Sequence, residues 1–438
     1  MSSAGPVYVV DGNRTPFLKA AGQPGPFRAA DLAVAAGRTL LARQPFAPEN
    51  LSEVILGCVI PSPDEVNIAR VVSQRLGCGV KVPAWTVQRN CGSGMQALET
   101  AADRIRAGHS SLVLAGGVEA MSHAPVLLSQ EMVGWLGAWN RARSARAKLR
   151  LLAGLRPRHF RLVIGLLQGL TDPVVQLNMG QTAEILAEMF GLTREAMDGY
   201  ALRSHQRLAA ASDQGRMEEI APLYAADGRY FTEDEGLRRD ASPDKLARLQ
   251  PAFDRKFGRI TAGNSAQVTD GAALLLLADA ATVDRLRLPI LGWIEETRWA
   301  GIAPEHMGLG PVHAVEALLR DRNLQVEDID YWELNEAFAA QVLACLKAMA
   351  DPAYCATHLH REQPLGHLDP DRLNVDGGAI ALGHPVGASG ARIVLHLLHV
   401  LKQRKATRGI ATLCIGGGQG GAMLVSRPNS TMDSNGKD

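Results

Sequence analysis

Apolar runs of strand length alternate with amphipathic helical patterns along most of the chain. Residues 7–10, 54–60 and 112–115 are largely apolar and rich in β-branched side chains, which is typical of buried strands. Helical spacing follows at 67–76, and residues 95–105 place apolar side chains on one helical face. Strands that alternate with helices predict an α/β fold with buried sheet strands.

This pattern is interrupted in the middle of the first half. Residues 122–250 are more polar, and the apolar pattern returns with a strand at 272–277. We therefore expect three units: an N-terminal half formed by 1–121 with 251–285, an inserted loop domain at 122–250, and a C-terminal half at 286–438.

The two halves repeat one local plan. Gly-Ser-Gly at 92–94 and Ala-Ser-Gly at 388–390 each open a predicted helix. Each helix leads to a predicted strand, at 112–115 and at 410–414, that is followed by glycines. The shared order and spacing predict a duplicated α/β domain.

Composition narrows the class of protein. The 438 residues carry 46 Lys+Arg and 45 Asp+Glu, a formal net charge of +1, which argues against a nucleic-acid binder. The six cysteines are scattered and form no C-x-x-C pair, so neither a disulfide scaffold nor a metal site is expected. We see no signal segment and no apolar run of the roughly 20 residues that a membrane span needs. The expectation is a soluble, cytoplasmic protein.

Cys91 is the first candidate for chemistry. It lies at a strand-to-helix turn between Asn90 and Gly92, where the positive end of the helix macrodipole favours a thiolate and is expected to lower the thiol pKa. A small glycine allows a substrate to approach the sulfur. The alternative is a buried cysteine that acts as a small hydrophobe.

Two further residues suit a cysteine nucleophile. His384, in the loop Gly-His-Pro-Val-Gly at 383–387, has a side chain able to accept the thiol proton. Cys414 ends a predicted strand, immediately before Ile415 and three glycines, and could serve as a second acid/base. A surface or structural role is the alternative for His384.

Asn335 and Gly416 each allow two interpretations. Asn335 is well placed to be a helix N-cap, or to orient a water or a carbonyl oxygen. Gly416 either permits a tight turn or presents its N–H to a developing oxyanion. The glycines at 416–421 also match G-x-G-x-x-G, but the 17 residues that follow leave no room for the helix and strand of a dinucleotide-binding unit.

Five motifs together resemble the thiolase family over nearly the whole chain. They are V-D-G-N-R-T-P-F at 10–17, N-C-G-S-G-M-Q-A-L at 90–98, N-E-A-F-A at 335–339, G-G-A-I-A-L-G-H-P-V-G-A-S-G at 377–390 and C-I-G-G-G-Q-G at 414–420. The resemblance implies a five-layered αβαβα fold with two duplicated core halves and an inserted loop domain.

The resemblance also implies a mechanism. Cys91 would be the nucleophile, His384 its base and Cys414 the second acid/base. Asn335 would hold a water near the thioester oxygen, and the N–H of Gly416 would help to bind an oxyanion. The reaction implied is coenzyme A-dependent cleavage of a 3-ketoacyl-CoA to acetyl-CoA and a shortened acyl-CoA, through an acyl-cysteine. Coenzyme A would be a substrate, and no cofactor is expected.

The substrate pocket implied by the resemblance is formed by a larger set. The residues that match positions around acyl-CoA are Met179, Arg238, Phe253, Ser265, Met307, Ala337 and Phe338. Two departures affect this set: Asn178 stands where some short-chain members have histidine, and Ala266 stands where a pantetheine-contacting serine is common. A homodimer or homotetramer is the expected assembly.

The stretch 131–171 has no acidic residue between Glu131 and Asp172. It is rich in Arg and Lys interleaved with Trp and Leu, and it resembles the insertion in thiolase subunits of trifunctional-type fatty-acid oxidation complexes. Two roles are implied: contact with an anionic membrane, which would make the protein peripheral to that membrane, or contact with a hydratase/dehydrogenase partner. A solvated helical loop is the third interpretation.

Several functions remain open at this point. A degradative 3-ketoacyl-CoA thiolase is preferred, with a biosynthetic acetoacetyl-CoA thiolase as the alternative. A ketoacyl-synthase-like condensing enzyme would usually replace Asn335 with a histidine and would not need Cys414. An inactive carrier is expected to lack Cys91, His384 or Cys414, and a membrane scaffold leaves the five motifs unexplained.

Overall fold

The computed structural model describes residues 5–428, and the outermost ends of the expected domains, 1–4 and 429–438, lie outside this range. Ten strands in the described chain form one hydrogen-bonded sheet with the order β12-β13-β14-β11-β1-β10-β5-β3-β4, and β2 pairs with β10. The strands of this sheet are β1 (Val7–Arg14), β2 (Leu18–Lys19), β3 (Glu53–Gly57), β4 (Ala84–Val87), β5 (Leu112–Ala120), β10 (Thr269–Ala278), β11 (Gly292–Gly301), β12 (Tyr331–Leu334), β13 (Arg408–Ile415) and β14 (Gln419–Ser426).

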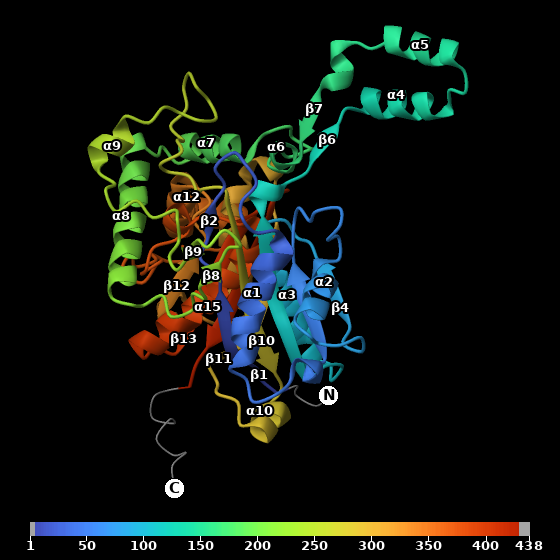
Figure 1. The fold of residues 1–438 in the computed structure, drawn as a ribbon. Helices are drawn as coiled ribbons and strands as arrows, with labels where there is room; N and C mark the ends of the chain where they lie inside the picture. The colour runs from blue at the N-terminus through green and yellow to red at the C-terminus, as the bar shows by residue number, and fades with distance from the viewer. Residues whose placement is uncertain (1–4, 429–438) are drawn as a thin grey trace.

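Helices cover the sheet and fill the space between its two halves (Figure 1). The helices of the body are α1 (Ala29–Ala42), α2 (Ile68–Arg75), α3 (Ser93–Arg106), α7 (Met179–Met189), α8 (Arg194–Asp213), α9 (Pro243–Ala247), α10 (Ala280–Leu286), α11 (Gly310–Arg322), α12 (Ala339–Ala350), α13 (Pro352–His358), α14 (Ala379–Leu382) and α15 (Val386–Arg404).

The period-two pattern of the strands explains the layers. Along β10, Leu274 and Leu276 face a core shared with α1 and α2, whereas Leu275 and Leu277 face a core shared with α3 and α15. Successive side chains of a strand point to opposite faces, so a fully apolar strand must be covered on both. The middle core therefore lies between the two halves of the sheet.

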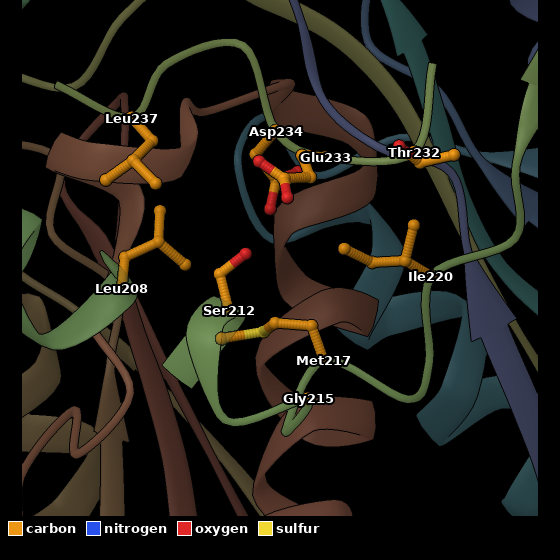
Figure 2. A pocket seen from close by; sticks show the side chains of 9 residues that line it. All are labelled: Leu208, Ser212, Gly215, Met217, Ile220, Thr232, Glu233, Asp234 and Leu237. Atoms are coloured by element: carbon orange, nitrogen blue, oxygen red, sulfur yellow. The ribbon is translucent and has the colours of Figure 1, made fainter. Parts of the chain in front are cut away.

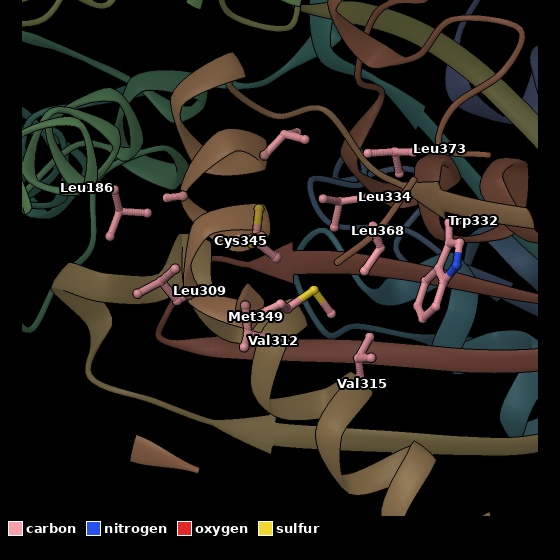
Figure 3. Packing of buried hydrophobic residues seen from close by; sticks show 14 of the residues in the cluster. Leu186, Leu309, Val312, Val315, Trp332, Leu334, Cys345, Met349, Leu368 and Leu373 are labelled. Carbon is pink, nitrogen blue, oxygen red and sulfur yellow. The ribbon is translucent and has the colours of Figure 1, made fainter. Parts of the chain in front are cut away.

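The C-terminal half repeats this arrangement. Leu413 of β13 faces the middle core, whereas Leu424 of β14 faces an outer core with α11 and α12. Figure 3 shows this outer core, which includes Val312, Met349 and Trp332. The order is α1/α2, sheet, α3/α15, sheet, α11/α12, and the expected αβαβα class is confirmed.

The helices α3 and α15 meet at their first turns, where only glycine fits. A Cβ on Gly94 would lie 2.8 Å from the Ala391 nitrogen and from the Gly387 oxygen. A Cβ on Gly390 would lie 2.6 Å from the Met95 nitrogen. The duplicated small residues thus bring the starts of the two helices into backbone contact.

The expected insertion divides into two parts. From 179 to 247, α7, α8, the short strands β8 (Leu223–Tyr224) and β9 (Tyr230–Phe231) and α9 lie against the body, with Leu186 and Met197 in the outer core. Residues 126–164, called the arm below, project from it (Figure 1).

The arm is a helical hairpin on a two-stranded stem. Its elements are β6 (Val126–Leu128), α4 (Gln130–Arg141), α5 (Ala145–Ala153) and β7 (Leu162–Ile164), with β6 paired to β7. The short helix α6 (Gly165–Gly169) then leads back to the body. Neither α4 nor α5 buries a residue. Among residues 5–428, no helix is both long and apolar enough to cross a membrane.

Candidate active site

One cavity of about 90 Å³ brings together chemistry-bearing residues from both halves. Cys91 precedes α3, His384 precedes α15, Cys414 lies near the end of β13, and Gly416 follows that strand. The remaining wall residues are Met121, Leu170, Met179, Ala266, Gln267, Val268, Met307, Ala337, Phe338 and Val386.

The meeting of Cys91 and His384 follows from the helix contact. Each residue lies just before the first turn of its helix, and Gly94 and Gly390 bring those turns into backbone contact. Gly117 adds to the close approach, because a Cβ there would lie 1.9 Å from the Gly387 oxygen. Residues nearly 300 positions apart therefore share one cavity.

Cys91 is held as a thiol in this cavity. Burial raises the pKa of Cys91 to about 11 and outweighs the backbone N–H groups of Gly416 and of Cys91 itself, which act to lower it. The expectation of a lowered pKa at the helix N-terminus is therefore wrong, because loss of solvation exceeds the effect of the nearby backbone N–H groups. The backbone N–H groups of Gly416 and Cys91 nevertheless lie close enough to the Cys91 sulfur to act on its pKa.

The ring of His384 is held in one tautomer by Ser389. The distance from His384 Nδ1 to Ser389 Oγ is 2.6 Å, and Ser389 Oγ donates to the Pro385 carbonyl oxygen at 3.1 Å. Since the hydroxyl has one hydrogen and a carbonyl only accepts, Nδ1 must donate to Ser389. The Nε2 lone pair is then free, and Nε2 has no partner among the described residues.

The surroundings keep His384 neutral. Burial, with a smaller effect from the Arg392 charge, lowers the pKa of His384 to about 4. Neutral imidazole with an unprotonated Nε2 is the form that can accept a proton at neutral pH.

Cys414 is also a neutral thiol. Burial, then the proximity of Cys91 and Cys345, raises the pKa of Cys414 well above its ordinary value. The strand reverses direction just beyond it, at Gly417 and Gly418, whose φ angles are 89° and 76°. These glycines form the β13–β14 turn rather than a dinucleotide-binding loop, as the short remaining sequence predicted.

Asn335 is not a helix cap. Helix α12 begins four residues later, at Ala339, with Phe338 at its N-cap position, so the capping interpretation is wrong. The side chain is 1% exposed, its Nδ2 has no partner among the described residues, and its Oδ1 lies 3.5 Å from an Arg392 nitrogen. Arg392 is fixed in turn by Glu333 at 2.8 Å.

Glu119 lies outside the cavity wall but holds segments next to it, and sequence reasoning missed this residue. Its buried carboxylate accepts the backbone N–H groups of Val59, Ile60 and Gly387 at 2.9–3.0 Å. It thus ties the 59–60 loop to the first turn of α15, next to His384. Burial raises the pKa of Glu119 to about 7, against those hydrogen bonds. One carboxylate in the otherwise apolar run Leu112–Ala120 is the signal that could have revealed it.

Three of the predicted substrate residues do not line the cavity. Phe253 packs edge-on against Phe338, with ring centroids 5.9 Å apart. Ser265 is buried and donates to the Thr261 oxygen at 2.7 Å. Arg238 is exposed, two residues beyond Gly236, whose carbonyl accepts from the wall residue Gln267. Asn178 caps α7 with its side chain.

A separate cavity of about 210 Å³ lies beside the C-terminal end of α8 (Figure 2). It contains none of the predicted catalytic residues. Its buried acid, Asp234, is neutralised by Arg14 at 2.7 and 2.9 Å and accepts the Phe17 N–H. The described residues contain no group of three or more His, Cys, Asp or Glu side chains able to hold a metal ion.

Comparison with known proteins identifies the family. The family model for the thiolase N-terminal domain matches residues 7–281, and the model for the thiolase C-terminal domain matches 288–427. The chain belongs to the thiolase family. The matches span both halves of the αβαβα fold, and this thiolase is an acyl-transferring enzyme, as expected from the motifs.

Relatives match this thiolase over almost their whole length. A 3-ketoacyl-CoA thiolase of Serratia proteamaculans is 37% identical over 422 residues, which cover 96% of each chain. An acetyl-CoA acetyltransferase of Chromobacterium violaceum is 39% identical over 427 residues, which cover 96% of this chain and all of that protein.

Solved structures give the same result. The crystal structure of human mitochondrial 3-ketoacyl-CoA thiolase has a TM-score of 0.84 at 35% identity and covers 97% of this chain and 99% of that one. The same human protein in complex with CoA has a TM-score of 0.83, with 98% of this chain covered and 99% of that one.

Proposed function

We propose that this enzyme cleaves 3-ketoacyl-CoA with coenzyme A to give acetyl-CoA and a shortened acyl-CoA. The observation that carries the proposal is one cavity whose wall holds two thiols and an imidazole with a free Nε2. Two thiols and a base are what a carbon–carbon cleavage through an acyl-cysteine requires.

In the first half-reaction, Cys91 gives its proton to His384 Nε2 and attacks the 3-keto carbon. Because the cavity favours neutral thiol and neutral imidazole, proton transfer accompanies attack rather than preceding it. The tetrahedral oxyanion is stabilised by the N–H groups of Cys91 and Gly416. When the bond between C2 and C3 breaks, Cys414 protonates the acetyl-CoA carbanion, whose thioester oxygen faces His384 and a water held by Asn335.

In the second half-reaction, coenzyme A gives its thiol proton to the Cys414 thiolate and attacks the acyl-Cys91 thioester. The released Cys91 thiolate recovers its proton from His384. Every proton and electron pair is accounted for without oxidation or reduction, so the proposed reaction has coenzyme A as a substrate and uses no cofactor.

Coenzyme A binding is supported by the human mitochondrial relative, whose solved structure is a complex with CoA. The wall formed by Gln267 adjoins the segment that carries the exposed Arg238. We assign the nucleotide end of coenzyme A to this side, with Arg238 as its phosphate contact.

The biosynthetic direction is the second candidate. It is favoured by the 39% identity to a protein named acetyl-CoA acetyltransferase. In that direction Cys414 removes a proton from acetyl-CoA, and the enolate attacks acetylated Cys91. A condensing enzyme of the ketoacyl-synthase kind is less well supported, because Cys414 lies in the cavity and Asn335 stands in place of a second histidine.

The test is coenzyme A-dependent cleavage of acetoacetyl-CoA and of longer 3-ketoacyl-CoA substrates. We expect cleavage that disappears in Cys91→Ala. Cys355→Ala, which removes a buried cysteine outside the cavity, is the matched control and should retain activity. Absence of cleavage at every length, or decarboxylation of malonyl-CoA in its place, would reject the thiolytic function.

We further propose that the arm binds an anionic lipid surface, which would make a cytoplasmic enzyme peripheral to the membrane. The arm exposes Leu149, Phe160 and Leu162 at 66%, 61% and 59% of their surfaces. Between them lie cations and no acid, and Lys148 lies over the Trp139 ring at 5.3 Å. Apolar side chains among positive charges suit an interfacial helix pair.

Vesicle co-sedimentation tests this role. The enzyme should bind phosphatidylglycerol vesicles more strongly than phosphatidylcholine vesicles, and added salt should weaken the binding. The triple variant Arg146→Glu, Lys148→Glu, Arg150→Glu should lose it. The control Lys402→Glu, Arg404→Glu, Lys405→Glu makes the same change in net charge at the end of α15 and should keep it.

Deletion of 140–165 sharpens this test. Unchanged vesicle binding after the deletion would reject the lipid role. If the deletion instead prevents assembly with a hydratase/dehydrogenase subunit and leaves vesicle binding unaltered, the partner interpretation replaces it.

A homodimer or homotetramer completes the proposal. Its support is β4, which lies at one edge of the sheet, pairs within the described part of the chain only with β3, and exposes Trp85 at 38%. An open edge strand is a ready surface for pairing with a second copy. Light scattering after size exclusion should give at least twice the chain mass of 46.9 kDa.

A further inference from the structure

A second and larger cavity, of about 430 Å³, continues from the catalytic one. The two share six wall residues, Cys91, Met121, Leu170, Met179, Val386 and Gly416. Beyond Cys91 the larger cavity runs between the loop at 59–60 and the segment 168–174, which leads from α6 towards α7.

The chemistry of this cavity differs from that of a phosphate site. Its described wall contains no Lys, Arg or His. Its one acid, Asp172, is buried, and its carboxylate accepts the N–H groups of Val174 and Val175 at 2.8 and 3.1 Å. Asn90 is likewise occupied, since it donates to the Gly416 oxygen at 2.7 Å. The surface left for a ligand is mainly apolar.

The position of the cavity assigns it to one end of the substrate. The catalytic cavity has its Gln267 wall towards Gly236 and Arg238, where we place coenzyme A. The larger cavity opens on the side of the 59–60 and 168–174 segments instead. An acyl group bonded to Cys91 would extend into it.

We propose that this cavity receives the hydrocarbon chain of medium- and long-chain 3-ketoacyl-CoA substrates, with Gly169 as the residue that sets the permitted length. This inference rests on the proposed thiolytic function and adds the substrate class. A methylene group takes up about the 30 Å³ that a water molecule occupies in the liquid. A cavity of about 430 Å³ therefore has room for about fourteen chain carbons, so a ten-carbon chain fits within it.

Gly169 sets the permitted chain length because the cavity is open only where residue 169 has no side chain. A Cβ at this position would lie 3.5 Å from the Ile60 Cδ1 atom, an ordinary contact across the two walls. Its absence keeps the space between Ile60 and Leu170 open. A larger side chain at residue 169 would bridge the walls beyond Cys91 without disturbing the sulfur, the imidazole or Cys414.

The experiment compares kcat/KM for 3-ketoacyl-CoA substrates of four to sixteen carbons in the wild type and in Gly169→Phe. Each buried methylene raises kcat/KM by up to about fourfold, so the wild type should prefer ten carbons to four by tenfold or more. Gly169→Phe should lose at least tenfold at ten carbons and stay within twofold for acetoacetyl-CoA. The KM for coenzyme A should not change.

The matched control is Gly199→Phe, at an exposed position of α8 where an added Cβ meets nothing within 4 Å. It should keep the wild-type length profile. The inference is overturned if Gly169→Phe lowers all lengths equally, if the KM for coenzyme A rises in that variant, or if the wild type gains nothing from added carbons.

A binding measurement separates this inference from the proposed function. Saturated acyl-CoA of two to twelve carbons is titrated calorimetrically into Cys91→Ala and into Cys91→Ala with Gly169→Phe. Affinity that rises with chain length only in the first protein supports the acyl cavity even if no cleavage is detected. Affinity that ignores chain length in both proteins overturns it.

Discussion

The helices α3 and α15 each carry a serine in the first turn, and the two serines make different hydrogen bonds. Ser93 of α3 accepts the Arg89 backbone N–H at 2.8 Å and donates to the Asn90 oxygen at 2.7 Å. Ser389 of α15 likewise donates to a backbone oxygen, that of Pro385. Its Oγ accepts a hydrogen bond from His384 Nδ1, where Ser93 accepts one from a backbone N–H. A serine fixes the loop before the helix in both halves, but only Ser389 also orients a histidine ring.

The strands that follow these helices, β5 and β13, carry different chemical groups near their ends. In the N-terminal half, β5 runs for nine residues to Ala120, and Glu119, with its buried carboxylate, is the residue before its end. In the C-terminal half, β13 ends at Ile415 and turns back at once, which leaves Cys414 and Gly416 on the cavity wall. The duplicated plan supplies the frame, and each departure from it supplies a different chemical group.

The largest expected effect is the loss of thiolysis on substitution of Cys91 or Cys414, one cysteine from each half. Cys91→Ala should lower thiolysis by at least about 10⁴-fold, because the nucleophile is lost. Cys414→Ala should lower thiolysis comparably yet still form acyl-Cys91 from a simple acyl-CoA, since that step breaks no carbon–carbon bond. Mass spectrometry of the two variants after exposure to acyl-CoA checks this. Acylation of Cys91→Ala, or none of Cys414→Ala, would contradict the division of roles.

A smaller effect on kcat is expected when Ser389, the serine that contacts the His384 ring, is substituted. Ser389→Ala should reduce kcat roughly tenfold to a hundredfold, because Nδ1 loses its acceptor and the imidazole is free to change tautomer and orientation. Ser389→Thr should restore much of the rate. The pH dependence of kcat should change in Ser389→Ala, whereas Ser93→Ala, matched in the other half, should lower stability without changing that pH dependence.

The helix contact gives a stability effect of intermediate size. Gly94→Ala and Gly390→Ala should each destabilise the fold by about 1–3 kcal/mol, because the added Cβ meets backbone of the other helix rather than a movable side chain. Urea unfolding monitored by circular dichroism measures this. Gly134→Ala in the arm, where a Cβ meets nothing within 4 Å, is the control. Equal stability of all three variants would show that the contact is not tight.

The smallest effect is the pH dependence of stability that comes from His396, a buried histidine of α15 paired with Glu219. Burial acts to lower the pKa of His396, but Glu219 at 3.0 Å raises it above its ordinary value. A raised folded-state pKa stabilises fully below the unfolded value of about 6.5 and is lost as the pH rises through the folded value. The stability advantage of the wild type over His396→Gln should therefore be larger at pH 6 than at pH 9. An advantage that grows with pH would reverse this assignment.

The order of strands and helices was largely readable from the chain. The apolar runs at 112–115 and 272–277 predicted β5 and β10, although both strands extend further, because hydrogen-bonded partners continue strands past the apolar run. The strand predicted at 54–60 ends at Gly57 instead, as Glu119 takes the N–H groups of residues 59 and 60. The local sequence around Asn335 allows a helix cap there, because nothing local shows that α12 starts only at Ala339.

By itself the sequence determined which residue types stand at the helix starts, the repeated Ser-Gly pairs and the identity of Cys91, His384 and Cys414. Periodicity and turn chemistry depend on neighbours along the chain, so they can be read from it. Only the tertiary structure decided that Cys91 is a thiol of raised pKa, that Ser389 selects the His384 tautomer and that an apolar cavity passes Gly169. Solvation and cavity shape are sums over groups from distant segments, and these groups meet only when the chain has folded.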